Sequence, residues 1–281
     1  MTNYILVFIS VFGLAQASFG QELSRKGHFN VYWGWNRSQY TKSDIHFSGD
    51  NYDFTLNDVL AHDRQTKFGL NPYFHPGYVS LPQTNAHIGY FIDDHYELAL
   101  SLEHMKYVMD QYQRVEIDGE IWGNSVFAGV YEQEEIQLIR NFMKYEHTDG
   151  LNYINLELNR QDLLADIHVG LKHPFKLYST LGLAGGFMLP RTNATVLGGK
   201  RYDDFHVSGY GISSKIGLQV HYKNLFFQTD IKGGFIDMND IRINENKNAK
   251  AKQHFGFVQY MIAFGYEFSI KSKAKTQSNE Q

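Results

Sequence analysis

Residues 258–268 read Val-Gln-Tyr-Met-Ile-Ala-Phe-Gly-Tyr-Glu-Phe. The even-numbered positions are all large and apolar, and most of them are aromatic, whereas the odd-numbered positions are mainly small or polar. Successive side chains of a β-strand point to opposite faces, so this alternation predicts a strand with one apolar and one polar face. An apolar face rich in aromatic rings, opposite a face of small and polar residues, is typical of the wall of a membrane barrel.

The same alternation recurs in seven other segments, which makes eight in all. The further segments are residues 29–36, 85–92, 97–103, 154–159, 180–189, 212–222 and 225–235. We therefore predict an all-β fold, an up-and-down antiparallel transmembrane β-barrel of eight strands. A ten-strand count stays open, because Ile167-His-Val-Gly-Leu171 can be an extra strand or an early start of the strand that follows it.

The connections between these segments run long and short in turn, which predicts long loops at the extracellular end and both termini in the periplasm. The sequence of the long loops predicts ordered structure within them. Residues 115–122 predict a hairpin around Asp118-Gly119, and residues around Gly49-Asp50 predict another. The spacing of Ile136, Ile139 and Phe142 predicts a short helix over residues 132–145.

The rest of the composition excludes several classes of protein. The chain has 281 residues, a formal net charge of −4 and no cysteine, so it has no disulfide scaffold and no thiolate metal site. No basic stretch is dense enough to follow a nucleic-acid backbone, and nucleic acid is not an expected partner. Residues 1–20 are uncharged and largely apolar, which predicts a signal peptide before a barrel at 21–270 and a disordered tail at 271–281.

The chain resembles the small outer-membrane β-barrels of Gram-negative bacteria, of the OmpA/OmpX/OmpW kind. The resemblance lies in the apolar and polar faces of its strands, in the alternation of long and short connections and in the final aromatic strand. The resemblance covers residues 27–270 and implies an outer-membrane location. It carries no catalytic motif with it.

The polar face of each predicted strand would point into a lumen that is just wide enough for the side chains of the barrel itself. The charged residues on these polar faces are Glu97, Glu103, Glu157, Lys215, Asp230, Lys232 and Glu267, and His87 lies on a polar face as well. One interpretation is an ion-pair network that plugs the barrel, because buried charges must be paired. The other is a narrow path for cations, lined by the surplus of three acids.

Histidines are frequent at the predicted extracellular strand ends: His62, His104, His147, His206 and His254. They are either tolerated interface residues or part of a site for lipid phosphates, a metal or a catalytic water. The catalytic candidates are His104, His147 and Asp149, and the metal candidates are Glu146, His147, Asp203 and His206. No spacing matches a known catalytic or metal motif.

Three functions follow from these features. The leading hypothesis is a non-enzymatic outer-membrane barrel with a plugged lumen, whose ordered loops contact outer-membrane lipid or glycolipid, a surface protein or a small ligand. The second is a hydrolase that acts on acyl esters or phosphates of lipids through the rim histidines. The third is a narrow channel for small solutes or cations. No cofactor is expected.

Overall fold

The computed structural model describes residues 24–75, 82–245 and 247–270. The predicted signal peptide and the predicted tail both lie outside these residues. The elements in chain order are β1 (His28–Tyr40), β2 (Ser43–Gly49), β3 (Tyr52–Val59), β4 (Ala61–His62), α2 (Leu70–Tyr73), β5 (Thr84–Phe91), β6 (Tyr96–Met109), β7 (Arg114–Ile121), β8 (Gly129–Gln137), β9 (Met143–Ile167), β10 (Phe175–Val196), β11 (Tyr202–Phe205), β12 (Gly209–Tyr222), β13 (Leu225–Arg242) and β14 (Lys250–Ser269). Within the described ranges, no helix is long and apolar enough to cross a membrane.

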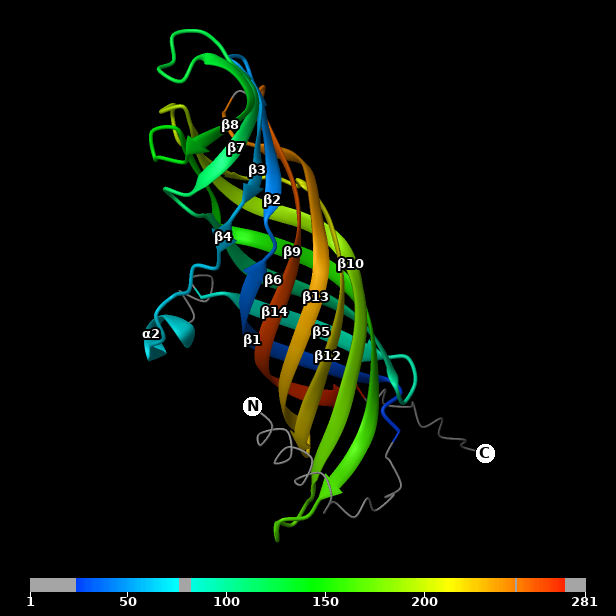
Figure 1. The fold of residues 1–281 in the computed structure, drawn as a ribbon. Coiled ribbons are helices and arrows are strands. Elements are labelled where there is room, and N and C mark those ends of the chain that lie inside the picture. The colour runs from blue at the N-terminus through cyan, green and yellow to red at the C-terminus, as the bar shows by residue number, and fades with distance from the viewer. Residues whose placement is uncertain (1–23, 76–81, 246, 271–281) are drawn as a thin grey trace, which may run out of the picture.

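Eight long strands form a closed antiparallel barrel (Figure 1). Their order around the wall is β1, β5, β6, β9, β10, β12, β13 and β14, and β1 pairs with β14 to close the ring. The prediction of an eight-stranded up-and-down barrel is confirmed. The ten-strand alternative is wrong, because β9 runs on to Ile167 and pairs there with Phe175, so that residues 168–174 are a turn.

The outer and inner faces of this wall differ as the alternation predicts. Leu156 is 70% exposed and Leu183 is 65% exposed on the outer face, whereas Glu157, the neighbour of Leu156, is 1% exposed on the inner face. Large apolar side chains of all eight strands form a continuous outer band, which we call the apolar belt. An apolar belt around a polar lumen is the arrangement of a barrel that faces lipid.

The chain enters and leaves the barrel at one end, where His28 pairs with Ser269, and we call this the proximal end. At the opposite, distal end, five strands continue beyond the apolar belt. There β14 exchanges its partner β1 for β2, with Gln253 opposite Ile45. The distal extension consists of β2, β3, β4, β7, β8 and β11 with residues 104–109, 143–153, 188–196, 236–242 and 250–257 (Figure 1).

The hairpin predicted around Gly49-Asp50 is confirmed by β2 and β3, in which Gly49 pairs with Tyr52. The hairpin predicted at Asp118-Gly119 is wrong. Strand β7 runs straight through these residues, because it pairs with β3 on one edge and with β8 on the other. Gly119 instead serves a β-bulge: its φ is +122°, and a Cβ there would lie 2.3 Å from the carbonyl oxygen of Asp53.

The helix predicted over residues 132–145 is also wrong. Residues up to Gln137 belong to β8, and β9 begins at Met143. Ile139, Phe142 and Met143 come from the turn and the strand that follows, and they face the same apolar cluster as Ile136. The apolar residues thus have helical spacing because a strand, a tight turn and a second strand all bury apolar side chains in the same cluster. The short helix in the described residues is α2, in the segment before β5.

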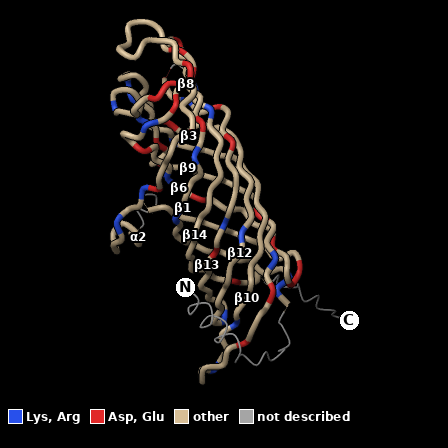
Figure 2. The backbone as a smooth tube through the Cα atoms, in the orientation of Figure 1, with Lys and Arg blue, Asp and Glu red and all other residues tan. Residues whose placement is uncertain are grey.

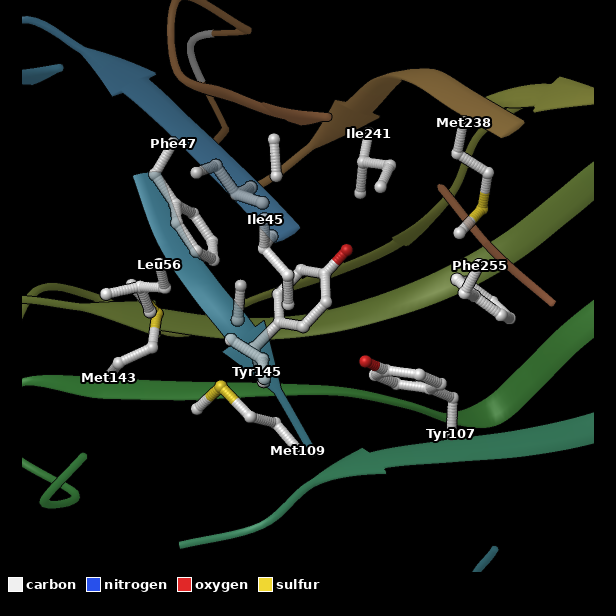
Figure 3. Packing of buried hydrophobic residues seen from close by; sticks show 14 of the residues in the cluster. Ile45, Phe47, Leu56, Tyr107, Met109, Met143, Tyr145, Met238, Ile241 and Phe255 are labelled. Atoms are coloured by element: carbon white, nitrogen blue, oxygen red, sulfur yellow. The ribbon is translucent and has the colours of Figure 1, made fainter. Parts of the chain in front are cut away.

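The inner side of the distal extension is an apolar core (Figure 3). Phe47 of β2, Leu56 of β3, Met143 of β9 and Ile241 of β13 point toward one another there and are all completely buried. The core is rich in aromatic contacts, such as that of Phe47 with Tyr145 at 5.5 Å between ring centroids. The β-strands beyond the belt thus enclose a hydrophobic interior, whereas the strands within the belt enclose a polar one.

Candidate functional site

The lumen holds a compact ion-pair network at the level of the apolar belt. Lys232 of β13 contacts Glu103 of β6 and lies 2.9 Å from Glu157 of β9. Lys215 of β12 lies 2.6 Å from the other carboxylate oxygen of Glu157. Each of these side chains is at most 6% exposed, and they come from four different strands. The network therefore spans the lumen and links opposite parts of the wall.

The remaining predicted lumen residues surround this centre. Asn159 donates to both Glu97 and Glu157 at 3.1 Å, and His87 lies 3.4 Å from Glu97. Asp230 accepts a hydrogen bond of 2.6 Å from Gln228. The structure thus gathers these groups inside the barrel, where amide side chains from neighbouring strands satisfy much of the hydrogen-bonding capacity of the carboxylates.

Arg25 is a member of the lumen network that the alternation of side chains along the strands did not identify. Its guanidinium donates to Glu267 at 2.6 Å and to Gln161 at 2.9 Å, and it lies over the rings of Phe91 and Tyr178. It precedes β1, so no strand alternation assigns it a face. With Arg25 counted, five acids face three permanent cations, and the surplus is two acids rather than the three that the sequence indicated.

Distal to the network, the apolar core fills the interior of the distal extension. A buried polar cluster lies within this core. Gln253 donates to the hydroxyl of Tyr107 at 2.7 Å and accepts from that of Tyr145 at 3.2 Å. Ser43 completes it as a neighbour of both Tyr107 and Gln253. Along the barrel axis, the interior thus holds ion pairs at the level of the belt and an apolar core beyond them.

The predicted catalytic residues do not form a common site. His147 is completely buried against Tyr107 and Tyr145, where it hydrogen bonds with Thr192 at 3.1 Å. Burial lowers the pKa of His147 to about 3. His104 lies on the outer face of β6, where it donates to Asn152 at 2.9 Å, and burial lowers its pKa too.

Asp149 is exposed and lies within electrostatic range of His104, but no hydrogen bond among the described residues joins His104, His147 and Asp149. His104 and His147 are on adjacent strands, as expected, but on opposite faces. A hydrolytic site that opens to lipid headgroups would need both rings on one accessible face, so the geometry does not support the hydrolase hypothesis.

The predicted metal ligands are likewise not brought together. Glu146 accepts a hydrogen bond from Asn193 at 2.6 Å, Asp203 pairs with Arg191 at 2.9 Å, and His206 pairs with Asp240 at 2.8 Å. Across residues 24–75, 82–245 and 247–270, no three His, Asp or Glu side chains are close enough to hold a metal ion. The other rim histidines are surface residues. His62 contacts Asp110, and His254 is exposed beside Phe235.

Strands β7 and β8 of the distal extension are rich in acidic residues (Figure 2). Residues 114–137 contain six acids, against Arg114 as the one basic residue. The acids are Glu116, Asp118, Glu120, Glu132, Glu134 and Glu135, and all six are exposed. Glu116 lies directly opposite Glu135, and Asp53 of β3 lies directly opposite Glu120. We call the two strands that carry these acids, β7 and β8, the acidic hairpin.

No family model and no curated protein matches the chain. Solved structures that resemble it include Ail of Yersinia pestis, determined in complex with the heparin analogue sucrose octasulfate (10% identity, 86% of this chain and 99% of that chain, TM-score 0.33). The others are the N-terminal β-barrel domain of Pseudomonas aeruginosa OprF (12%, 86% and 98%, 0.32) and AlkL in DMPC bilayers (9%, 92% and 98%, 0.38). These identities and TM-scores are too low to transfer a function, which has to be inferred from the chain's own side chains.

The chain's own geometry is that of an antiparallel β-barrel: eight strands close a ring with an apolar belt outside and a polar lumen inside.

Proposed function

We propose that this protein is a closed outer-membrane barrel that anchors a binding surface outside the cell. The proximal end and both termini face the periplasm, and the distal extension projects from the outer leaflet. The observation that carries this proposal is that side chains occupy the lumen at two successive levels, first the network around Lys232 and Glu157 and then the apolar core. A barrel built to conduct solutes would keep a hydrated path through these two levels.

The acidic hairpin is the surface that we propose takes the partner. Among the described strands, β8 pairs with β7 alone, so its second edge carries backbone N–H and C=O groups available to another strand. The pairing of Glu116 with Glu135 sets like charges opposite each other, and Arg114, which contacts Glu135, compensates only part of this charge. Both features favour an extended, basic segment of a partner protein that adds to β8 as a further strand.

Closure is tested by conductance in planar bilayers. The purified protein, shown to be folded by the heat-dependent shift of its gel mobility, should give no conductance above that of the bare bilayer. Lys232→Ala, with a matched exposed variant Lys200→Ala, tests whether the ion pairs contribute to closure. Ohmic conductance of the wild-type protein, with a preference for cations, would support the channel hypothesis instead.

Binding is tested with a fluorescein-labelled peptide of alternating lysine and valine, against a peptide of alternating glutamate and valine. We expect saturable, salt-sensitive binding of the lysine peptide alone. The triple variant Glu116→Gln/Glu120→Gln/Glu134→Gln should lose it, whereas a control that removes exposed acids elsewhere, Asp204→Asn/Glu245→Gln, should retain it. Equal binding of both peptides, or no effect of the triple variant, would contradict the assignment of the acidic hairpin.

A further inference from the structure

A groove lies on the outer wall of the barrel, between the segment around α2 and strands β1 and β14. It has a volume of about 410 Å³, within the range of small-molecule sites. Its floor includes Trp35, Tyr260 and Ile262, and its other side includes Phe68 and Phe74. Trp35 and Ile262 pair across β1 and β14, and Ile262 belongs to the apolar belt, so the groove is continuous with the surface that faces lipid.

The segment beside the groove is fastened to the wall at one edge. Tyr73 packs on Trp35 with ring centroids 6.0 Å apart, and Phe74 packs on it edge-to-face at 5.3 Å. The guanidinium of Arg37 donates to the hydroxyl of Tyr73 at 3.1 Å. Even so, Phe68 remains 75% exposed and Phe74 58% exposed. Aromatic side chains in these positions contact water in a soluble protein but acyl chains in a membrane.

Polar groups at the groove suit a lipid headgroup. Arg37 lines it. Lys106, outside the lining, lies within electrostatic range of Arg37 and Arg64 and of the acids Asp63 and Asp149, and Arg64 pairs with Glu146 at 3.4 Å. Burial, and next the charge of Arg64, lower the pKa of Lys106. Among the described residues, the indole N–H of Trp35 has no hydrogen-bond partner, and an ester carbonyl that enters the groove can accept from it.

We propose that this groove binds one acyl chain of an outer-leaflet lipid whose phosphate lies against Arg37 and its neighbouring cations. The occupant follows from the continuity of the groove with the apolar belt and from the charge at its distal end. This site is separate from the acidic hairpin, but it rests on the proposed membrane location of the barrel. It gives the segment around α2 a role as a lipid clamp rather than as an irregular loop.

Two tryptophans on one strand allow the groove and the membrane location to be tested separately. Trp35 lines the groove, whereas Trp33 is 38% exposed on the apolar belt two residues away. Single-tryptophan proteins are made by replacing the others, including Trp122, with phenylalanine. Each is reconstituted in phosphatidylcholine vesicles that contain a minor fraction of phosphatidic acid with brominated acyl chains, or of phosphatidylcholine brominated in the same way.

We expect brominated phosphatidic acid to quench Trp35 at a mole fraction at which Trp33 is quenched only in proportion to the bulk lipid. Arg37→Gln should weaken this preference about fivefold, as the loss of one basic contact with an anionic lipid predicts. Arg37→Lys should retain most of it, and Arg160→Gln at the proximal end should change nothing. Preferential quenching of Trp35 that survives in Arg37→Gln would refute the role of the phosphate.

The other outcomes separate the two proposals. Quenching of both tryptophans in proportion to the bulk lipid, with no preference for phosphatidic acid, would leave the barrel in the membrane and overturn the groove as a binding site. Quenching of neither tryptophan would overturn the membrane location itself.

Discussion

Replacing Lys232 by methionine should destabilise the barrel by about 3 kcal/mol. Loss of one partner from a buried ion pair typically costs about 3–5 kcal/mol, because the remaining charge is left without compensation. Here Glu157 keeps Lys215 at 2.6 Å and the amide of Asn159 at 3.1 Å, which favours the lower end of that range. Glu103 keeps only the hydrogen bond from Asn155 at 3.0 Å, and most of the loss should come from its carboxylate.

The double variant Lys232→Met/Glu103→Gln tests this explanation. The neutral amide that replaces the carboxylate of Glu103 no longer needs a cation, so the double variant should be more stable than Lys232→Met alone, with a coupling of about 1–3 kcal/mol between the two sites. Unfolding in urea is followed by tryptophan fluorescence in lipid vesicles, with the exposed variant Lys200→Met as the control. If the two single losses summed within about 0.5 kcal/mol in the double variant, the network would not act as a unit and the reasoning would be refuted.

Three further predictions concern the distal extension and the proximal end. Burial holds the pKa of His147 at about 3, below about 6.5 for an exposed histidine, so its neutral folded form should stabilise the protein fully above pH 6.5 and progressively less as the pH falls toward 3. The free energy of unfolding in urea should therefore change with pH in this range by up to about 1.4 kcal/mol per pH unit, and this pH dependence should shrink in His147→Gln. An unchanged pH dependence in His147→Gln would contradict the prediction. Phe47→Ala should cost about 3–5 kcal/mol by opening a cavity in the apolar core, and limited proteolysis should detect it in the distal extension before the barrel loses its heat-dependent gel shift. Arg25→Gln should cost about 3 kcal/mol by leaving the carboxylate of Glu267 with His28 as its neighbour at 2.9 Å, and Arg25→Lys should restore only part of it because lysine lacks the planar guanidinium; equal stability of the Gln and Lys variants in urea would count against this ion pair.

The barrel itself was predictable from the chain because its main signal is local. A period of two along each strand assigns every side chain to the lipid or to the lumen without knowledge of its neighbours. Ile262 and Glu157 therefore lie where the alternation assigned them, and the strand count followed from repeating the same test. The β2–β3 hairpin was accessible for the same reason, since its turn residues Asp50 and Asn51 are adjacent to the strands that they join.

The two-residue alternation could predict only those lumen residues that lie on the strands themselves. Arg25 lies before the first strand, and its place beside Glu267 depends on a contact across 242 residues of sequence. His104 and His147 are on neighbouring strands, but the irregularity between Met105 and Tyr107 and the core formed by β2 and β3 determine which of them is enclosed.

The secondary structure of the distal extension follows the same division. Residues 132–145 have the spacing of a helix, and Asp118-Gly119 has the composition of a turn, so local preference alone favours both wrong assignments. In the folded chain, β7 has a partner on each edge, and pairing satisfies backbone groups that a turn at Asp118-Gly119 would leave open. Strand pairing and burial of Ile136, Phe142 and Met143 in one core outweigh the weak local signals. The alternation of side chains is thus a property of the sequence itself, whereas the ion pairs and the apolar core inside the barrel arise only when distant segments supply charges and apolar surface to the same interior.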